Sequence, residues 1–592
     1  RYVLLSGSAR PVSRHIPGNG GGGVNTIWFR GRPMIMKGPE RQVTNRDVAE
    51  QLALMGRLLE VAGADQHRAG AYARAARQVE RLSIPVAGLD EEALTRIPGI
   101  GVRIAAQIQE IAGTGSFREL DDLQATIPGS VIDLLDVSGV GPRTLHTLWK
   151  RLGIQTIDDL EAAVKGRRIR GLRGFGAKKE EAIGRGIRRY RERSNRMTRP
   201  QADAVLGSVA ALFPDGQYAV AGSYRRGAST VGKIDIVTTT DRAALMDHLL
   251  AGPGEDKEEV SLSISGARVN VRFTDPDRYG TELLCATGSG AFLARLAAVA
   301  QEQGYRLEPG GLVESTSGRL QAFGSEEEVF GFLGMETVPP ELREDRGEVE
   351  LALSRALPDL VELRDLRGDL HAHTIQSDGR QSLEDVAAAG DAMGYEYIAI
   401  TDHSSRVSLE ALAKQQAGIE RVNRRHTCQL LAGSEVDIRS DGSLGYPNGV
   451  LADLDLVIAS VHSGFDQDQD VLTRRVLNAM ENEHVDIIGH PTGRLLGRRP
   501  PYAIDLARVI DHAAATGTAL EINASPYRLD LEDIYIWHAK RKGVKLAAGT
   551  DAHRVGEFSN ICYGIMMARR GWCTPDDLAN TLSLPELLEW RS

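Results

Sequence analysis

Polar side chains of the types that bind divalent metal ions recur through the last third of this sequence, mostly directly after short apolar runs. The runs are typical of buried parallel strands, and helix-like stretches such as 383–392 and 503–515 separate them. This alternation predicts a parallel α/β barrel of about seven strands over residues 363–592. The clearest apolar runs are 397–400, 456–459, 485–488, 519–522 and 544–547.

Nine histidines and acids form the candidate metal-ligand set. They are His371, His373, Asp378, His403, Glu435, His462, His490, Asp551 and His553. Side chains two residues apart on a strand point to the same side, so His371 and His373 can bind one ion together, as can Asp551 and His553. Because barrel enzymes build their sites on the loops after the strands, we expect the set to converge there. Such a cage binds divalent cations that activate water, and without cysteine it suits manganese, zinc or iron.

The alternative interpretation is that these are ordinary polar residues. A single histidine is more often a satisfied polar group than a ligand, which is how we interpret His426, His512 and His538 on helix-like stretches. For nine such residues to coincide with strand ends by chance we assign odds of roughly one in fifty.

The segments around the set resemble the PHP (polymerase and histidinol phosphatase) phosphoesterase domain. They are residues 369–374, 401–404, 489–494, 521–530 and 549–553. The resemblance implies three metal ions, Mn²⁺ or Zn²⁺. It implies that the first is held by His371, His373, Glu435 and Asp551, the second by Glu435, His462 and His490, and the third by Asp378, His403 and His553. The candidate catalytic residues of this domain are Glu435, Asp551 and Arg494. From their position directly after strand ends, we expect Arg494 and Arg528 to contact the DNA backbone.

A strongly basic block stands out on a chain whose formal net charge is −9. Residues 165–196 hold thirteen basic and three acidic residues. Such a block is either a footprint for nucleic acid or a solvated helix face, and charge alone does not separate the two.

Three Gly-x-Gly turns, each followed by a predicted helix start, favour nucleic-acid binding. Such turns let a phosphate approach backbone N–H groups at the positive end of a helix. They resemble helix-hairpin-helix motifs, which bind DNA backbones without reading sequence. The candidate DNA-binding residues are Gly99, Gly101, Gly139, Gly141, Gly174, Gly176, Lys178 and Lys179.

The helical segment around the first turn resembles the small N-terminal domain of X-family DNA polymerases. In lyase-active members of that family a lysine near the hairpin forms a Schiff base with an abasic sugar. The matching position here is Gln107, whose amide cannot form one. We therefore expect no sugar-phosphate lyase activity by this route.

Residues 219–238 resemble the nucleotidyltransferase signature of the same family, in which a Gly-Ser turn precedes an Asp-x-Asp strand. The resemblance implies that the residues which bind a nucleoside triphosphate persist in part. They are Gly222, Ser223, Arg226, Gly288 and Ser289. The order of small domain, fingers, palm and thumb extends over about residues 44–345.

Two departures from that signature bear on polymerisation. The family holds two magnesium ions with three aspartates, whereas here only Asp235 remains, with Lys233 and Asn270 at the other two positions. A lysine ammonium repels magnesium at short range. We therefore expect DNA synthesis to be weak or lost, with Mg²⁺ or Mn²⁺ bound at the palm only if polymerase competence survives.

The predicted architecture is a multidomain chain with a disordered or spurious extension at the start. The helical domains would be α-helical helix-hairpin-helix folds, the palm and thumb an α+β nucleotidyltransferase, and the last domain the PHP barrel. The expected boundaries are 1–43 for the extension, 44–126 for the small domain, 127–197 for the fingers-like domain, 198–281 for the palm, 282–345 for the thumb, 346–362 for a linker and 363–592 for the barrel.

The resemblance to a PHP domain joined to an X-family polymerase implies a DNA-repair protein with a metal-dependent 3′→5′ exonuclease, and with abasic endonuclease or 3′-phosphatase activity as further options. The alternatives are an active gap-filling polymerase, a non-catalytic DNA-end scaffold and a small-molecule phosphatase. We expect a monomer that binds gapped, nicked or 3′-ended duplex DNA. Scattered cysteines suggest a reducing cytoplasm, where we expect the protein at the nucleoid, and no apolar run reaches the roughly 18–20 residues that span a membrane.

Overall fold

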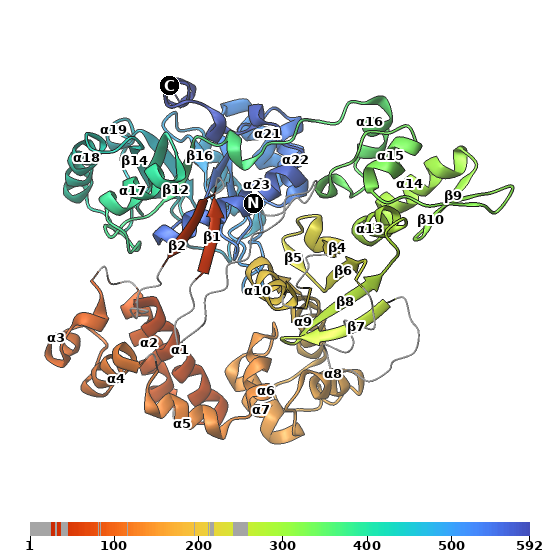
Figure 1. Ribbon diagram of the computed structural model, residues 1–592. Helices are drawn as coiled ribbons and strands as arrows, with labels where there is room; N and C mark the ends of the chain where they lie inside the picture. The colour runs from red at the N-terminus through yellow and green to blue at the C-terminus, as the bar shows by residue number, and fades with distance from the viewer. Residues whose placement is uncertain are drawn as a thin grey trace. The chain divides into compact units, whose positions relative to one another are not determined.

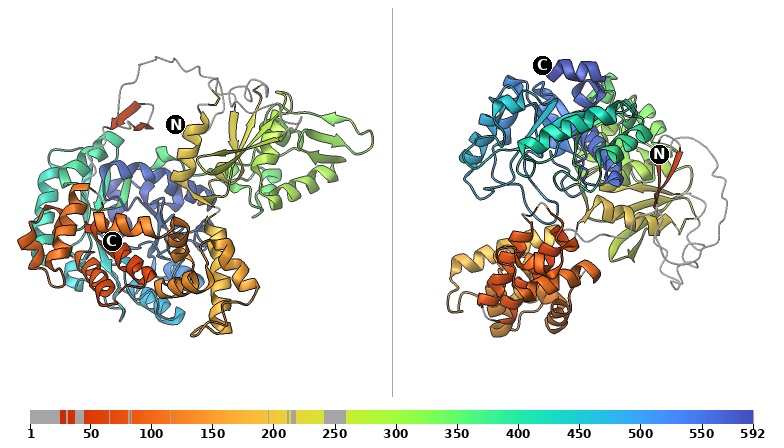
Figure 2. Two further views of the ribbon diagram at one scale, coloured as in Figure 1. Left: turned by 90° about the horizontal axis from the view of Figure 1, so that it is seen from below. Right: turned by 90° about the vertical axis from the view of Figure 1, so that its left-hand side faces the viewer.

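The computed structural model describes residues 45–591 apart from 65, 81, 83, 115, 195, 211, 214–217 and 241–258, together with two short strands before them. These strands, β1 (Asn25–Phe29) and β2 (Arg32–Met36), pair antiparallel. The expected extension covers residues 1–43, and apart from these two strands it lies outside the described residues. The chain divides into two units, Arg1–Glu192 and Arg193–Ser592 (Figures 1 and 2).

The first unit is helical, drawn in red to orange in Figure 1. Its helices are α1 (Asn45–Ala62), α2 (Gln66–Glu80), α3 (Glu91–Thr95), α4 (Val102–Thr114), α5 (Arg118–Thr126), α6 (Gly129–Asp133), α7 (Pro142–Leu152), α8 (Ile157–Lys165) and α9 (Ala177–Ser194). Local sequence sets several of their ends. Pro142 begins α7 and Gly153 ends it in a left-handed conformation, while Thr156 and Asp159 form a capping box at α8.

One hydrophobic core runs through this unit, from Val48 in α1 to Ile187 in α9. Helix α7 packs on α1, where the His146 ring nitrogen Nδ1 lies 2.9 Å from the carbonyl oxygen of Val61. The expected boundary between residues 126 and 127 therefore does not separate two cores. Because the small domain and the fingers-like domain bury their apolar faces against each other, they form a single body.

The second unit begins with a four-stranded sheet that resembles a palm. Its elements are β3 (Met197–Thr198), α10 (Arg199–Ala210), β4 (Tyr218–Ala221), α11 (Gly222–Arg225), β5 (Thr230–Val231), β6 (Ile234–Thr238), β7 (Glu259–Ile264) and β8 (Ala267–Phe273). The strand order is β4-β6-β8-β7, with β6 and β8 parallel and the other pairs antiparallel. Helix α10 packs on one face of the sheet, and α13 (Tyr279–Thr287) covers the other.

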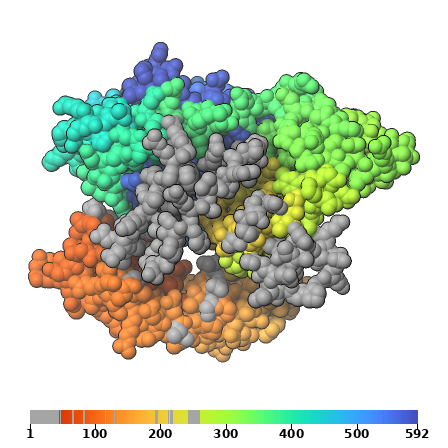
Figure 3. Space-filling view, viewed as in Figure 1, coloured from red at the N-terminus to blue at the C-terminus, as the bar shows by residue number. Residues whose placement is uncertain are grey.

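A thumb-like region follows, with its own apolar core. It contains α14 (Gly290–Glu302), the antiparallel strands β9 (Tyr305–Glu308), β10 (Gly311–Glu314) and β11 (Leu320–Gln321), α15 (Glu326–Phe332) and α16 (Glu348–Ser354). The expected linker, residues 346–362, is built into this core: Val349 of α16 and Leu360 are buried in it. Trp572 from the last domain joins the same core, and Figure 3 shows the thumb-like region, in green, packed against that domain. Residues 346–362 are therefore part of the packed core of this region and not a separate linker.

The last domain confirms the predicted barrel of seven parallel strands. The strands, in their spatial order, are β12 (Gly368–Ala372), β13 (Tyr397–Ile400), β14 (Gln429–Asp437), β15 (Leu456–Ser460), β16 (Ile487–Ile488), β17 (Ala519–Asn523) and β18 (Leu546–Gly549). Backbone hydrogen bonds from His373 N to Ala552 O and from Asp551 N to His371 O, both 2.9 Å, join the last strand to the first. The barrel is therefore almost closed, which directs all the strand ends to one rim.

Helices surround the barrel, as βα units require. They are α17 (Leu383–Met393), α18 (Leu409–Asn423), α19 (Asn448–Leu451), α20 (Gln469–Met480), α21 (Leu506–Thr516), α22 (Asp533–Arg541), α23 (Ile561–Arg570) and α24 (Leu584–Arg591). Nowhere in the described part of the chain is a helix both long and apolar enough to cross a membrane.

Candidate metal centre

The nine candidate ligands converge at the rim formed by the carboxyl ends of the barrel strands. His371 lies in β12 and Glu435 in β14, and the other seven lie in the loops that follow strands. Two of these loop residues, His490 and Asp551, adopt positive φ angles of 27° and 53°. Residues other than glycine rarely adopt positive φ angles, so the backbone is strained where it turns these two ligands inward.

Glu435 lies at the middle of the set. Its carboxylate oxygens are within 4 Å of five imidazoles: His371 (3.6 Å), His373 (3.7 Å), His403 (2.8 Å), His462 (3.0 Å) and His490 (2.8 Å). Burial alone raises the pKa of this carboxyl, but the charges of His462, His403 and His371 hold it well below its ordinary value. The centre of the set therefore carries a carboxylate that can be shared between ions.

Three groups of side chains have their ligand atoms within 4.8 Å of one another. They are His373 with Asp378, His403 and His553; His371 with His373 and Asp551; and His403 with Glu435 and His462. The groups overlap with the three expected ion positions but differ from each in membership. Glu435 is missing from the first, His403 takes the place of His490 in the second, and His373 joins the third. His373 faces both Asp551 (3.1 Å from Nε2) and Asp378 (3.8 Å from Nδ1), and His403 reaches Glu435 as well as Asp378.

The donor atoms fit divalent metal ions. Nδ1 of His373 and Nδ1 of His490 are buried without a hydrogen-bond partner, a state that a protein rarely leaves uncompensated. Imidazole and carboxylate donors suit manganese, zinc and iron. His371 and His373 are fully buried, whereas the side chains of His462 and His553 are 27% and 34% exposed, so the cluster opens to solvent on one side.

A second layer of carboxylates orients the imidazoles, and the sequence analysis did not identify it. Glu521 lies 2.6 Å from Nδ1 of His371, and Asp437 lies 2.7 Å from Nδ1 of His462. Asp402 accepts hydrogen bonds from Thr374 and Ser377 and so fixes the loop that carries Asp378. A signal for Glu521 was present, because an acid in the middle of a buried strand requires a partner.

The two arginines expected at DNA differ in what they contact. Arg494 is buried, and its guanidinium binds Glu532 and the backbone carbonyls of Arg528 and Leu529, which fixes a loop. Arg528 instead places Nε 3.4 Å from Asp551, and its side chain is 18% exposed against 5% for Arg494, although its terminal nitrogen Nη1 is buried without a hydrogen-bond partner. The geometry therefore favours Arg528 over Arg494 as the group that meets an anionic ligand.

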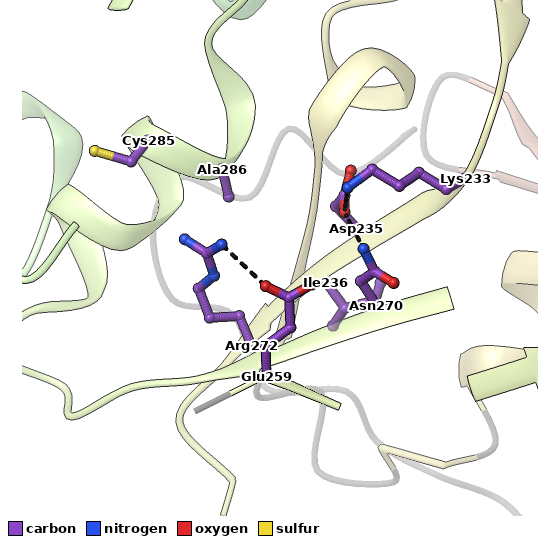
Figure 4. Close-up of a pocket in the computed structure, with 8 residues that line it drawn as sticks. All are labelled: Lys233, Asp235, Ile236, Glu259, Asn270, Arg272, Cys285 and Ala286. Carbon is purple, nitrogen blue, oxygen red and sulfur yellow. Dashed lines mark hydrogen bonds and ion pairs between the residues drawn. The ribbon is translucent and has the colours of Figure 1, made fainter. Parts of the chain in front are cut away.

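The palm position holds an internal ion pair. The Lys233 ammonium lies 2.7 Å from Oδ1 of Asp235, and the Asn270 amide donates to the same oxygen at 3.3 Å (Figure 4). The register of β6 and β8 pairs Asp235 with Asn270, as the resemblance requires. Lys233, Asp235 and Asn270 line a cavity of about 160 Å³. Its wall also carries a second ion pair, between Arg272 and Glu259.

Two of the residues expected to bind a nucleotide, Arg226 and Ser289, make contacts within the protein. Arg226 pairs with Glu344 at 3.0 Å and donates to the carbonyl oxygen of Thr287, and the Ser289 hydroxyl caps α14. Gly222 has a φ of 65°, and a Cβ there would lie 2.5 Å from an Asp235 carboxylate oxygen, so no other residue fits. Ser223 follows Gly222 in α11, and Gly288 precedes α14.

The three Gly-x-Gly turns of the first unit share one conformation. Gly99, Gly139 and Gly174 have φ angles of 89°, 90° and 83°. Around the second glycines, Gly101, Gly141 and Gly176, an added Cβ would meet nothing within 4 Å. Intramolecular packing therefore does not require glycine at these three positions, whereas close approach of an external backbone would.

Three further candidate residues lie near the turns. At the start of α9, Lys178 is exposed and Lys179 is half-buried, with its ammonium 4.1 Å from the centroid of the Phe175 ring. Gln107 is buried and bonded to Tyr72 and Glu119 at 2.9 and 2.7 Å, so this position offers an amide and no amine.

Models of known families match five stretches of the chain. A helix-hairpin-helix domain matches residues 43–117, a SAM-like helix-hairpin-helix tandem 131–189, a DNA polymerase beta palm 196–253, a DNA polymerase beta thumb 282–344 and a PHP domain 369–525. The matches follow the order expected from the motifs.

Individual relatives agree with this order. The DNA polymerase/3′-5′ exonuclease PolX of Bacillus subtilis is 33% identical over 563 residues, which cover 92% of this chain and 98% of the relative. A probable phosphatase of Thermoanaerobacter sp. is 32% identical over 36% of this chain and 89% of its own length. DNA polymerase lambda of Rattus norvegicus is 26% identical over 54% of this chain and 60% of its own length.

Proposed function

Because this chain belongs to the X-family DNA polymerases that carry a carboxy-terminal PHP domain, we propose that it is a DNA-repair enzyme whose PHP domain removes nucleotides from 3′ ends. The observation that carries the proposal is the convergence of nine metal-binding side chains, with buried unpartnered nitrogens, beside the guanidinium of Arg528. Related activities of the same chemistry, at abasic sites or on 3′-phosphates, belong to the same proposal.

The residues of the barrel rim have distinct tasks in this reaction. Divalent cations held by the nine ligands supply activated water and neutralise the charge on the phosphate. Glu521 and Asp437 accept from Nδ1 of His371 and His462, which leaves the Nε2 atoms of both rings facing the centre. Arg528, whose side chain is more exposed than that of Arg494, binds a phosphate oxygen of the DNA.

The helical unit holds the DNA in this proposal. Its three turns offer backbone N–H groups, and Lys178 and Lys179 after the third turn add positive charge. The contacts are to phosphates, so binding depends on backbone geometry more than on base sequence. We therefore propose gapped, nicked or 3′-ended duplex DNA as the partner of a monomer that works at the nucleoid.

Polymerisation is impaired in this proposal. The ammonium of Lys233 neutralises Asp235, and Asn270 replaces the third carboxylate, so the palm lacks the charge that holds two magnesium ions. Glu282, a conceivable substitute carboxylate, is paired with Arg272 at 3.2 Å. The alternative of an active gap-filling polymerase rests on the names of the relatives and on the surviving Asp235.

The experiment that tests the proposal incubates a labelled primer-template with Mn²⁺, with and without nucleotides. We expect the primer to shorten, and His371→Ala with His373→Ala to slow this by at least about 100-fold, because the double variant removes two ligands. His512→Ala is the matched control, since that histidine pairs with Glu481 on a helix outside the cluster.

The other functions predict other outcomes in the same assay. Extension of the primer, abolished by Asp235→Ala, would establish the gap-filling polymerase. Binding of DNA without any metal-dependent cleavage would establish the scaffold and refute the nuclease. Faster turnover of histidinol phosphate than of DNA would establish the small-molecule phosphatase.

A further inference from the structure

The loop that follows β17, residues 525–530, is held unusually firmly for a surface loop. Arg494 binds the carbonyl oxygens of Arg528 and Leu529 from one side. The carbonyl oxygen of Tyr527 accepts from Leu496 N at 2.7 Å, and Asn523 N donates to Asp530 O at 2.5 Å. The loop thus has a fixed shape at the rim of the metal centre.

This shape is strained at one residue. Leu529 has a φ of 44°, in the left-handed region that leucine rarely adopts, and its side chain is completely buried. Local strain of this kind persists only where the surroundings enforce it, and it clusters at functional sites. Its effect here is to turn Arg528 toward Asp551 while the preceding residue, Tyr527, points outward.

Tyr527 is the most exposed aromatic residue among the large hydrophobic side chains that the structure describes. Its side chain is 53% exposed, although Pro526 before it and Leu529 after it are buried. Its hydroxyl makes no hydrogen bond to the described part of the chain. The exposed guanidinium of Arg498, from the loop that carries Arg494, lies 5.9 Å from the centroid of the Tyr527 ring.

We propose that Tyr527 is a stacking platform for the unpaired base of the nucleotide at the DNA 3′ end, with Arg528 on its phosphate and Arg498 beside the ring. The inference rests on the proposed nuclease function and names its substrate class. A rigid, exposed ring next to a guanidinium is how proteins hold single-stranded nucleic acid without reading its sequence, because every base has a stacking face. A base that is paired within a duplex cannot stack on the ring, so frayed, mismatched and single-stranded ends are preferred.

The test compares the wild-type protein with Tyr527→Ala and Tyr527→Phe on two short single strands. One strand ends in a normal nucleotide and the other in an abasic tetrahydrofuran. We expect Tyr527→Ala to raise KM about 10- to 100-fold for the normal end, with kcat nearly unchanged, and to change nothing for the abasic end. Tyr527→Phe retains the ring and should behave as the wild type. Leu588→Ala, an exposed side chain of α24, is the control.

A binding measurement separates this inference from the proposed function. A strand that ends in 2-aminopurine reports stacking by loss of fluorescence, and it does so in EDTA, where metal-dependent cleavage stops. Quenching by the wild type and Tyr527→Phe but not by Tyr527→Ala supports the platform even if no variant cleaves DNA, an outcome that refutes the nuclease alone. Equal quenching by all three overturns the platform, as does an equal loss of kcat on both strands with Tyr527→Ala, which would indicate a structural role in the loop.

Discussion

At the scale of single residues, carboxylates outside the nine-ligand set orient the imidazoles of the candidate metal centre. Asp437 accepts from Nδ1 of His462, which fixes the ring orientation and directs Nε2 toward Glu435. We expect Asp437→Ala to lower metal affinity and nuclease activity about 10- to 100-fold, since loss of a hydrogen-bond partner of a metal-binding histidine typically has an effect of this size. Metal content by elemental analysis and the rate of primer shortening measure the two effects.

The control for this prediction is Asp441→Ala. Asp441 lies four residues later, is exposed, and bonds only to the backbone and hydroxyl of Ser443 among the described residues. It should keep both metal and activity. If Asp437→Ala matched it in both measurements, the orientation of His462 would not depend on this carboxylate.

The palm offers a second prediction at this scale. In Lys233→Asp with Asn270→Asp, three carboxylates again face one another, and Ser261, which donates to Asn270 Oδ1 at 2.8 Å, retains its acceptor. Several kcal/mol of charge stabilisation by restored metal ions correspond to at least about 100-fold in rate. We expect gap filling by the double variant to exceed the wild-type rate by that factor, measured as nucleotide incorporation with Mg²⁺.

The same double variant with Asp235→Ala should remain inactive. Incorporation that survives the loss of Asp235, or a double variant no faster than the wild type, would mean that Lys233 and Asn270 are not what limits synthesis.

At the scale of elements, α15 is fixed by its first residue. The Glu326 carboxylate is buried between the guanidinium groups of Arg343 and Arg225, at 2.6 and 2.7 Å. Burial raises its pKa, but these charges outweigh burial and lower it to about 2, from an ordinary value of 4.5. Since the folded pKa lies below the unfolded one, this stabilisation is complete above about pH 4.5 and is lost as the pH falls toward 2.

We therefore expect Glu326→Gln to destabilise the thumb by about 3 kcal/mol at neutral pH, because the buried Arg343 and the partly buried Arg225 lose their partner. The difference from the wild type should shrink as the pH is lowered from 4.5. Hydrogen exchange of α13 and α15 amides measures it locally. Glu327→Gln, at the exposed neighbouring residue, should change neither the stability of the thumb nor its pH dependence. If the loss of stability in Glu326→Gln did not vary with pH, the charge of Glu326 would not be its cause.

The elements also show how far the sequence could predict this fold. The apolar runs gave β13, β15, β17 and β18 to within about two residues, because strands buried on both faces are continuously apolar. The same pattern is interrupted by Asp369 and His371 in β12, so that strand was identified from its motif instead. The expected helices 383–392 and 503–515 correspond to α17 and α21.

The candidate site could be predicted as a set but not as a geometry. Residue type and position after a strand identify the nine ligands, whereas the sharing of His373 and His403 between groups depends on side-chain directions that no spacing encodes. Arg494 and Arg528 look alike in sequence and differ only in what surrounds them. Tyr527 was missed because one aromatic residue in a loop has no pattern.

At the scale of the second unit, one arginine links the palm, the thumb and the barrel. Arg570 of α23 binds the Arg226 backbone carbonyl, Glu344 and Asp533, and Arg346 joins it at Asp533. We expect Arg570→Ala to lower the unfolding temperature by about 6–12 °C, since it leaves the partly buried Glu344 and Asp533 with fewer partners. Calorimetry measures this. Arg424→Ala, at an exposed arginine directly after α18, should leave the temperature unchanged, and an equal shift in both variants would show that the contacts of Arg570 do not stabilise this unit.

The first unit has a consequence for damage recognition that follows from its shared core. Since α1 through α9 bury their apolar faces together, the three glycine turns have a fixed spacing and cannot adjust independently to a bound strand. A strand whose phosphates fall out of step must itself bend to engage all three. In the proposed function, the flexibility of the DNA, which breaks and gaps increase, would therefore set how well a strand engages all three turns.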